Sequence, residues 1–123
     1  MIRKLMIVDD SMLIRKKITR EFDRSKFDLV ASAENGEQAI EYFKMFQPEI
    51  VTMDITMPLF NGIQCIERLV EINPDVKILV ISALKDWDTG MEALEKGAQG
   101  FINKPVTQQS LIDALETLIE DDD

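Results

Sequence analysis

The stretch Ile50-Val51-Thr52-Met53 is a short run of β-branched and aliphatic residues, and Asp54 follows it directly. A run of this length with bulky side chains on both faces is typical of a strand in a central parallel sheet that helices cover on each side. Four other runs share this character, and the sequence therefore predicts five buried strands. The other four runs are Leu5 to Val8, Leu29 to Ala31, Ile78 to Ile81, and Phe101 to Ile102.

Longer amphipathic stretches separate these runs and predict five helices. Each has apolar residues at helical spacing, which indicates one face turned to a core. The expected core residues are Ile14, Ile18 and Phe22; Ala39, Ile40 and Phe43; Ile63, Ile66 and Val70; Met91 and Leu94; and Leu111, Leu115 and Leu118. Asn35 marks the start of the second helix, Asn73-Pro74 the end of the third, Gly97 the end of the fourth, and Thr107 caps the fifth.

Five strand–helix units in 123 residues predict one doubly wound, three-layer α/β domain over residues 1–123. The expected order of the five parallel strands is 2-1-3-4-5, with right-handed crossovers. In such sheets, ligands bind outside the carboxyl ends of the strands, near the switch between strands 1 and 3. The residues to inspect are therefore those that follow the predicted strands.

Composition excludes several classes of function. The chain has 14 basic and 23 acidic residues, a net charge of −9, which argues against nucleic-acid binding. It contains no histidine, so Ser-His or Cys-His catalysis and histidine-ligated metals are excluded. The single Cys65 allows no internal disulfide. No apolar run approaches the roughly 18 residues of a membrane span, and no secretory segment is recognisable. We therefore expect no membrane contact and a cytoplasmic location.

Polar side chains follow four of the five predicted strands. They are Asp9, Asp10 and Ser11 after the first, Asp54 after the third, Ser82 after the fourth, and Asn103 and Lys104 after the fifth. Asp10, Ser11 and Ser82 also have a simpler explanation, because Asp and Ser often cap the next helix. Asp54 has no such role, since no helix is expected before about Asn61. Asp54 is therefore the strongest candidate for a functional residue.

The sheet order would bring three carboxylates together, and this arrangement is costly. At about 4 Å and an effective dielectric constant near 20, each pair of like charges repels by about 4 kcal/mol. Such a cluster must hold protons or a cation. An all-oxygen set of ligands favours Mg²⁺, with Mn²⁺ also able to bind, and Mg²⁺ commonly joins carboxylates to phosphate oxygens. Lys104 and Ser82 could then contact a phosphoryl group, and Asp54 could accept it as an acyl phosphate.

These residues resemble the motifs of the receiver domains of two-component response regulators. The resemblance covers essentially the whole chain, and Val51 to Ile63 is especially similar to stand-alone chemotaxis regulators of the CheY type. Four motifs together make it specific, although each alone is weak. The motifs are Val8-Asp9-Asp10-Ser11, Val51 to Pro58 with Asn61-Gly62-Ile63, Ile81-Ser82-Ala83, and Lys104-Pro105.

The resemblance implies a switch in which a histidine kinase phosphorylates Asp54. Asp10, Asp54 and the backbone carbonyl of Thr56 would ligate Mg²⁺, and Asp9 would orient the metal's waters. Ser82 and Lys104 would contact the phosphoryl group. The resemblance also implies a cis Lys104–Pro105 peptide bond. The remaining implied features are Phe101 as a switch residue acting with Ser82, and a downstream partner bound by the fourth helix, fifth strand and fifth helix. We also expect a monomer that is not an enzyme beyond self-phosphorylation and autodephosphorylation.

Three alternatives remain open at this point. The chain could be the receiver part of a longer regulator with its own output domain. A haloacid-dehalogenase-like phosphatase would also use an Asp after a strand, but that chemistry needs an acid/base Asp where Thr56 stands. A flavodoxin-like FMN carrier would need a phosphate-binding loop after the first strand, where Asp9 and Asp10 would repel the phosphate.

Overall fold

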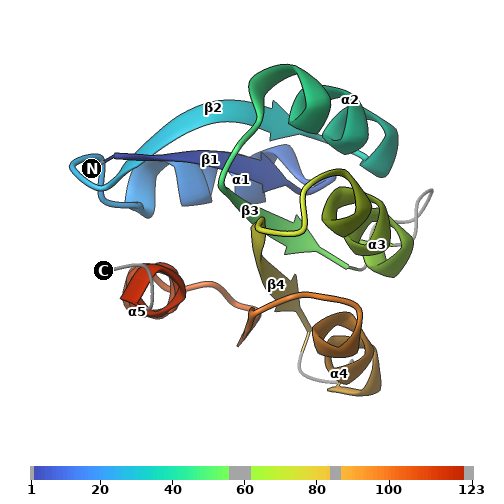
Figure 1. Cartoon of the computed structure of the whole chain (residues 1–123). Coiled ribbons are helices and arrows are strands. Elements are labelled where there is room, and N and C mark those ends of the chain that lie inside the picture. Colours follow the sequence, from blue (N-terminus) through green and yellow to red (C-terminus); the bar gives the residue numbers. More distant parts are fainter. Residues whose placement is uncertain (1, 56–61, 84–86, 121–123) are drawn as a thin grey trace.

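The computed structural model describes residues 2–55, 62–83 and 87–120, in which strands and helices alternate along the chain (Figure 1). The strands are β1 (Arg3–Val8), β2 (Phe27–Ala33), β3 (Ile50–Asp54), β4 (Lys77–Ser82) and β5 (Gly100–Asn103). The helices are α1 (Met12–Glu21), α2 (Gly36–Phe46), α3 (Gly62–Ile72), α4 (Trp87–Glu95) and α5 (Gln108–Glu120).

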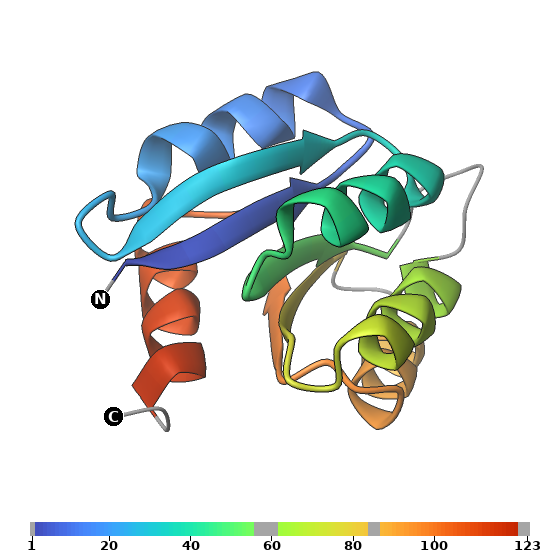
Figure 2. The same cartoon turned by 45° about the horizontal axis from the view of Figure 1, so that its top comes forward.

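The five strands form one parallel sheet in the order β2-β1-β3-β4-β5, which confirms the predicted topology. Figure 2 shows β1 and β2 side by side, and it shows α2 and α3 together on one face of the sheet. The chain reverses its direction of travel across the sheet after β2, so β1 and β3 are neighbours. This is the switch point at which doubly wound sheets bind their ligands.

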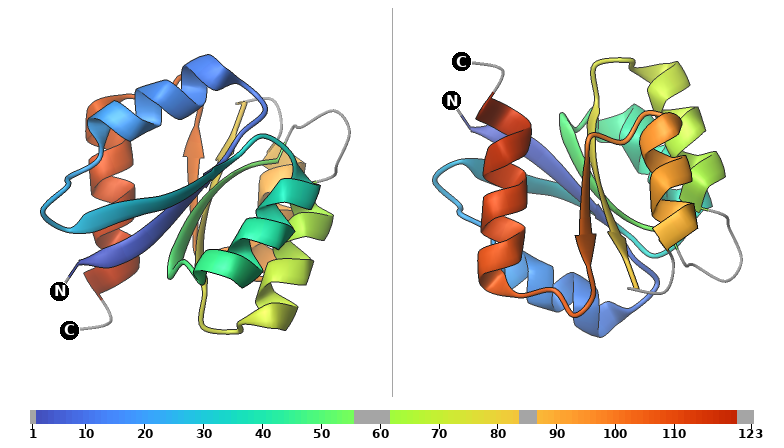
Figure 3. Two further views of the ribbon diagram at one scale, coloured as in Figure 1. Left: turned by 90° about the horizontal axis from the view of Figure 1, so that it is seen from above. Right: turned by 90° about the horizontal axis from the view of Figure 1, so that it is seen from below.

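Helices cover both faces of the sheet, with α1 and α5 on one face and α2, α3 and α4 on the other (Figure 3). Alternate residues of each buried strand point to opposite faces, because side chains in a strand alternate. In β1, for example, Leu5 and Ile7 join the core under α1 and α5, whereas Met6 and Val8 join the core under α2, α3 and α4. The predicted stripe of α5 is confirmed, since Leu111, Leu115 and Leu118 are all buried.

Polar side chains fix the starts of three helices. Ser11 Oγ accepts from Ile14 N–H at 3.3 Å to cap α1, and Asn35 Oδ1 accepts from Gln38 N–H at 2.8 Å to cap α2. Thr107 Oγ1 accepts from Ser110 N–H at 3.0 Å in the first turn of α5. The predicted start of α2 at Asn35 and the expected cap at Thr107 are confirmed, and at the start of α1 the hydroxyl of Ser11 serves as the cap.

Helix α4 differs from its expected packing. Met91 was expected in the core but is 42% exposed, and the residues that face the sheet are the small Gly90 and Ala93. Leu94 packs partly buried against the core, as expected. Gly97 ends the helix with a φ of 126°, a conformation that glycine adopts at no steric cost. Over the described residues, no helix is both long and apolar enough to cross a lipid bilayer.

Candidate functional site

The register of the sheet brings the ends of β1 and β3 together. Val8 lies opposite Met53, so the next residues, Asp9 and Asp54, stand at the same edge of the sheet. On the other side of β3, Ser82 at the end of β4 lies opposite Asn103 at the end of β5. The backbone N–H of Lys104 donates to the carbonyl of Ser82 at 2.7 Å, which continues this pairing beyond the strands.

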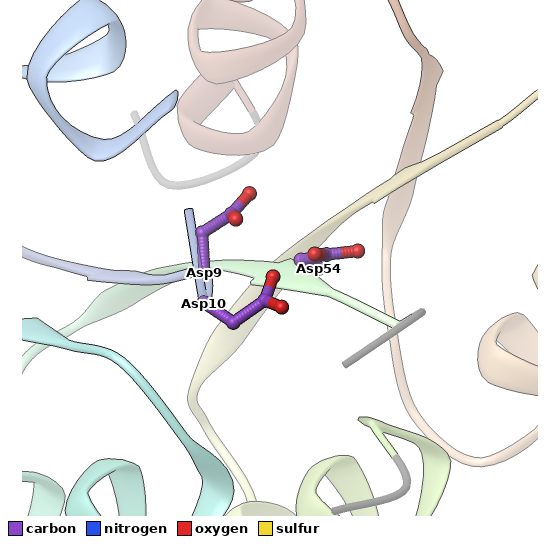
Figure 4. Close-up of side chains that lie close together, drawn as sticks. All are labelled: Asp9, Asp10 and Asp54. Atoms are coloured by element: carbon purple, nitrogen blue, oxygen red, sulfur yellow. The ribbon is translucent and has the colours of Figure 1, made fainter. Parts of the chain in front are cut away.

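Asp9, Asp10 and Asp54 form the carboxylate cluster of this edge (Figure 4). One carboxylate oxygen of each lies within 4.8 Å of the others. Asp9 and Asp54 are each 1% exposed, whereas Asp10 is exposed to solvent. The cluster therefore places two buried carboxylates and one exposed carboxylate around a common point. A ligand from solvent could reach this point from the side of Asp10.

Burial dominates the electrostatics of Asp9 and raises the pKa of its carboxyl from 3.8 to about 6. The charges of Asp54 and Asp10 also raise this pKa. The N–H of Ser11, which donates to Asp9 Oδ1 at 2.8 Å, and the charge of Lys104 lower it. The carboxyl of Asp9 is therefore mostly protonated in weak acid, where an ordinary aspartate is ionised.

Lys104 supplies positive charge to the cluster. Its Nζ lies 3.4 Å from Asp54 Oδ2, and the Lys104–Pro105 peptide bond is cis. Ser82 is fully buried, and its hydroxyl donates to the carbonyl of Ala83 at 3.2 Å. Four of the residues predicted from the strand ends, Asp9, Asp10, Asp54 and Lys104, therefore meet at one edge, with Ser82 on the adjoining strand.

Phe101, the other expected switch residue, packs its ring against α4. A Cβ atom built on Gly90 would stand only 2.0 Å from Phe101 Cε2, so the ring lies directly on the glycine backbone. Sequence reasoning does not single out Gly90. A glycine inside a predicted helix, opposite an aromatic residue on a short strand, is the signal that could have identified it. Thr56, the expected carbonyl ligand, lies outside the described residues.

Arg15 is a second residue that the sequence does not single out. Its Nη1 donates to the backbone carbonyl of Asp9 at 2.6 Å. Together with the Ser11 N–H bond to the Asp9 side chain, this contact fixes the chain between β1 and α1. The position of the acidic pair therefore depends on the first turns of α1.

The donor atoms of the cluster suit a hard divalent cation such as Mg²⁺, because they are all carboxylate oxygens. Among the described residues, Asp9 Oδ2 is buried and has no hydrogen-bond partner. A buried carboxylate oxygen without a partner is costly, and a hydrated cation beside it would relieve that cost. The residues present therefore fit Mg²⁺.

Residues 5–116 match the response regulator receiver domain family, and the chain belongs to this family. It is a phosphorylation-dependent signalling protein of the CheY-like kind and not a classical enzyme.

Among its relatives is the chemotaxis protein CheY of Thermotoga maritima, which is 37% identical over 113 residues, covering 92% of this chain and 94% of that protein. The chemotaxis protein CheY of Bacillus subtilis is 36% identical over 115 residues, covering 94% and 96%. A solved complex of CheX, CheY, BeF₃ and Mg²⁺ from Borrelia burgdorferi contains a chain that is 32% identical. It superposes with a TM-score of 0.88 and covers 95% of this chain and 89% of that one. These matches do not favour a phosphatase or an FMN carrier.

Proposed function

We propose that Asp54 accepts a phosphoryl group from the phosphohistidine of a histidine kinase. A carboxylate oxygen of Asp54 would attack phosphorus, the N–P bond would break, and the imidazole would leave with the electron pair of that bond. The observation that supports this role is the position of Asp54, buried between the acidic pair that follows β1 and the ammonium of Lys104 at 3.4 Å. The chain contains no histidine that could take this role or activate a serine or cysteine as the nucleophile.

We propose that Asp10 and Asp54, with the backbone carbonyl of Thr56, are the direct ligands of Mg²⁺, and that Mn²⁺ can replace it. Asp9, which is buried and whose Oδ2 lacks a partner among the described residues, would accept from the metal's waters. When bound, the ion neutralises the charge that gathers on the phosphoryl oxygens. The chain's part is to hold three carboxylates at fixed positions within 4.8 Å of one another.

Lys104 and Ser82 would contact the phosphoryl group once it is on Asp54. Lys104 already pairs with Asp54, and its flexible ammonium can move to an added phosphate oxygen while staying at the same edge of the sheet. The Ser82 hydroxyl donates to its own neighbour's carbonyl and can exchange that acceptor for a phosphoryl oxygen by rotation. The acyl phosphate would later be hydrolysed by the protein itself.

The signal would leave the site through Phe101 and the surface formed by α4, β5 and α5. Phosphorylation adds about −1.5 to −2 charges, and this matters to a partner only if two conformations differ in their affinity for the modified site. Ser82 and Phe101 lie on neighbouring strands, and Phe101 packs on α4. We propose that their joint movement changes how this surface binds a downstream protein, in a monomeric single-domain protein that works in the cytoplasm with its kinase.

Intact-mass spectrometry tests the acceptor directly. Incubation of the full chain with Mg²⁺ and acetyl phosphate should add the mass of one phosphoryl group to the wild type and to Asp28→Asn. Asp28 is a matched control, because it is an exposed aspartate on β2. Asp54→Asn should gain no mass. An adduct on Asp54→Asn at the wild-type rate would place the acceptor elsewhere. Chelation of Mg²⁺ should abolish labelling of the wild type.

A further inference from the structure

The backbone carbonyl of Asp9 lies where the chain leaves the sheet. Asp9 is 1% exposed, and β1 ends one residue before it, at Val8. Its N–H still pairs with β2, because it donates to the carbonyl of Ala33 at 3.1 Å. A buried carbonyl without a hydrogen-bond partner would be costly. The partner of this carbonyl is a side chain, since Arg15 Nη1 donates to it at 2.6 Å.

Arg15 is itself fixed by the helix on which it lies. Its backbone N–H donates to the carbonyl of Ser11 at 3.0 Å, and its carbonyl accepts from the hydroxyl of Thr19 at 2.7 Å. Within the described part of the chain, the guanidinium makes one hydrogen bond, to the Asp9 carbonyl, and it forms no ion pair with a carboxylate. Arg15 therefore ties the backbone of Asp9 to α1 and does not neutralise the carboxylate cluster by direct contact.

The peptide group that Arg15 holds is the one that joins the two acidic residues. The carbonyl of Asp9 and the nitrogen of Asp10 belong to one planar unit, so a donor on the carbonyl oxygen fixes the orientation of both. Consecutive residues of an extended strand point to opposite faces of the sheet. One carboxylate oxygen of each of Asp9, Asp10 and Asp54 nevertheless lies within 4.8 Å of the others (Figure 4). This convergence depends on how the chain bends at the Asp9–Asp10 peptide.

The peptide groups on either side of this one have other partners. The group before it is held by β2, through the bond from Asp9 N–H to Ala33. The group after it donates through Ser11 N–H to Asp9 Oδ1 at 2.8 Å. Neither bond acts on the Asp9 carbonyl. Without the guanidinium, the middle peptide group can therefore rotate, and its rotation would move Asp10, the exposed member of the cluster.

We propose that Arg15 is a positioning residue for the Mg²⁺ site. By holding the peptide group between Asp9 and Asp10, it keeps both carboxylates where one hydrated ion can use them. This inference rests on the proposed binding of Mg²⁺ by the cluster. It adds a residue of α1 that would touch neither the ion nor the phosphoryl group. Groups that orient the ligands of a metal in this way contribute about 10–100-fold to metal affinity.

An effect of charge alone predicts the opposite result. Arg15 carries a positive charge close to a site for a cation, so charge alone would make its removal strengthen the binding of Mg²⁺. Positioning requires that its removal weaken the binding of Mg²⁺. The direction in which the dissociation constant changes therefore separates the two explanations.

The test compares Arg15→Met with Lys16→Met in the full chain. Both variants replace a long cationic side chain of α1 by an uncharged one, but Lys16 is exposed to solvent. Arg15→Lys is the conservative variant, because it keeps the charge and an N–H donor on a shorter side chain. Titration of ¹⁵N-labelled protein with Mg²⁺ gives the dissociation constant by NMR, and circular dichroism checks folding. The rate of labelling by acetyl phosphate is measured over a range of Mg²⁺ concentrations.

We expect Arg15→Met to raise the dissociation constant for Mg²⁺ by at least about tenfold, and Arg15→Lys to raise it by less. Lys16→Met should leave it within about twofold of the wild type, because an exposed charge is screened. In Arg15→Met, half-maximal labelling should need correspondingly more Mg²⁺. The maximal labelling rate should stay within about threefold of the wild type, since saturating Mg²⁺ restores the positions of its ligands.

Unchanged or tighter binding of Mg²⁺ by Arg15→Met would overturn the proposal, and so would an equal loss of affinity in Lys16→Met. A lower maximal labelling rate with unchanged affinity for Mg²⁺ would also overturn it. If Arg15→Met does not fold, Arg15→Lys decides, and a dissociation constant equal to that of the wild type would then contradict the proposal. If the wild type neither binds Mg²⁺ nor is labelled at Asp54, the proposed function itself fails, and this inference fails with it.

Discussion

Lys104 Nζ lies 3.4 Å from Asp54 Oδ2, so the cation contacts the buried member of the cluster that we propose as the phosphoryl acceptor. The Asp54 side chain is almost fully buried, and the Lys104 side chain is partly exposed. Loss of this ion pair would therefore be more costly for the buried carboxylate than for the lysine, which water can solvate. This asymmetry determines what removal of the lysine should do.

Lys104→Gln should lower the free energy of unfolding by about 1–3 kcal/mol when divalent cations are chelated. Asp54 would then remain buried beside Asp9 and Asp10 without its positive neighbour. Added Mg²⁺ should narrow the difference from the wild type, because the ion replaces the missing charge. Urea unfolding with and without Mg²⁺ measures both effects. Lys96→Gln, at an exposed position after α4, controls for the change in net charge, and an equal loss in both variants would contradict the prediction.

Asp9→Asn should make the metal-free protein more stable at neutral pH. The pKa of Asp9 is about 6 in the folded protein, above its ordinary value of 3.8. Between these values the folded protein binds a proton that the unfolded chain has released, so the stability due to Asp9 is fully present below about pH 4 and is lost as the pH rises through 6. Asn at this position stays neutral at every pH and avoids the loss.

The measurement for Asp9→Asn is the difference in urea midpoint between variant and wild type, taken at several pH values with a chelator present. The variant should exceed the wild type at pH values above about 6, and the difference should shrink toward pH 4. Mg²⁺ should stabilise the wild type more than the variant. A difference that does not change with pH would show that the ionisation of Asp9 does not contribute.

Gly90→Ala should destabilise the protein, although alanine is the better helix former by about 1 kcal/mol. The new Cβ would stand 2.0 Å from the ring of Phe101, and either α4 or the ring must move. Forced repacking of this kind costs about 1–3 kcal/mol. In a Phe101→Ala background the steric conflict is absent, so Gly90→Ala should then raise stability. A double-mutant cycle of urea midpoints measures this reversal of sign, and its absence would mean that the ring yields without cost.

Thr52→Val should raise the free energy of unfolding by about 1–2 kcal/mol. Thr52 is 1% exposed in the centre of β3, and its hydroxyl has no hydrogen-bond partner among the described residues. Valine has nearly the same shape and removes the buried hydroxyl. Thr52→Ser is the informative comparison, because it keeps the hydroxyl and removes the methyl group, and it should destabilise. Thermal unfolding of the three proteins shows whether the buried hydroxyl lowers the stability of the protein.

The sequence predicted the sheet order and the meeting of the carboxylates for one reason. In a doubly wound sheet, polar residues that follow buried runs must gather at one edge, so Asp9, Asp10 and Asp54 could be placed together from their spacing alone. Packing depended on details that spacing does not contain. Met91 has the hydropathy of a core residue, but α4 approaches the sheet through Gly90 and Ala93, because the ring of Phe101 occupies the space where a larger side chain would lie.

The exposure and partners of individual side chains were also beyond the sequence alone. The apolar stripe of α1 was evident, yet Met12 and Leu13 could be recognised as exposed only once Ser11 was seen to start the helix and Ile18 to face the core. The buried hydroxyl of Thr52 is a similar case. A threonine within a β-branched run predicts a strand, and only its described neighbours in three dimensions show that none of them is a hydrogen-bond partner of its hydroxyl.

Ser11 belongs to two structures at once, since its N–H donates to the Asp9 carboxylate and its hydroxyl caps α1. Its amide proton is therefore a built-in spectroscopic reporter. In a ¹⁵N-labelled sample, the Ser11 resonance should shift when a cation is titrated in, and the first amides of α1 should shift with it. These signals would record occupancy of the site, without an added dye or radioactive phosphate, at the turn where α1 begins.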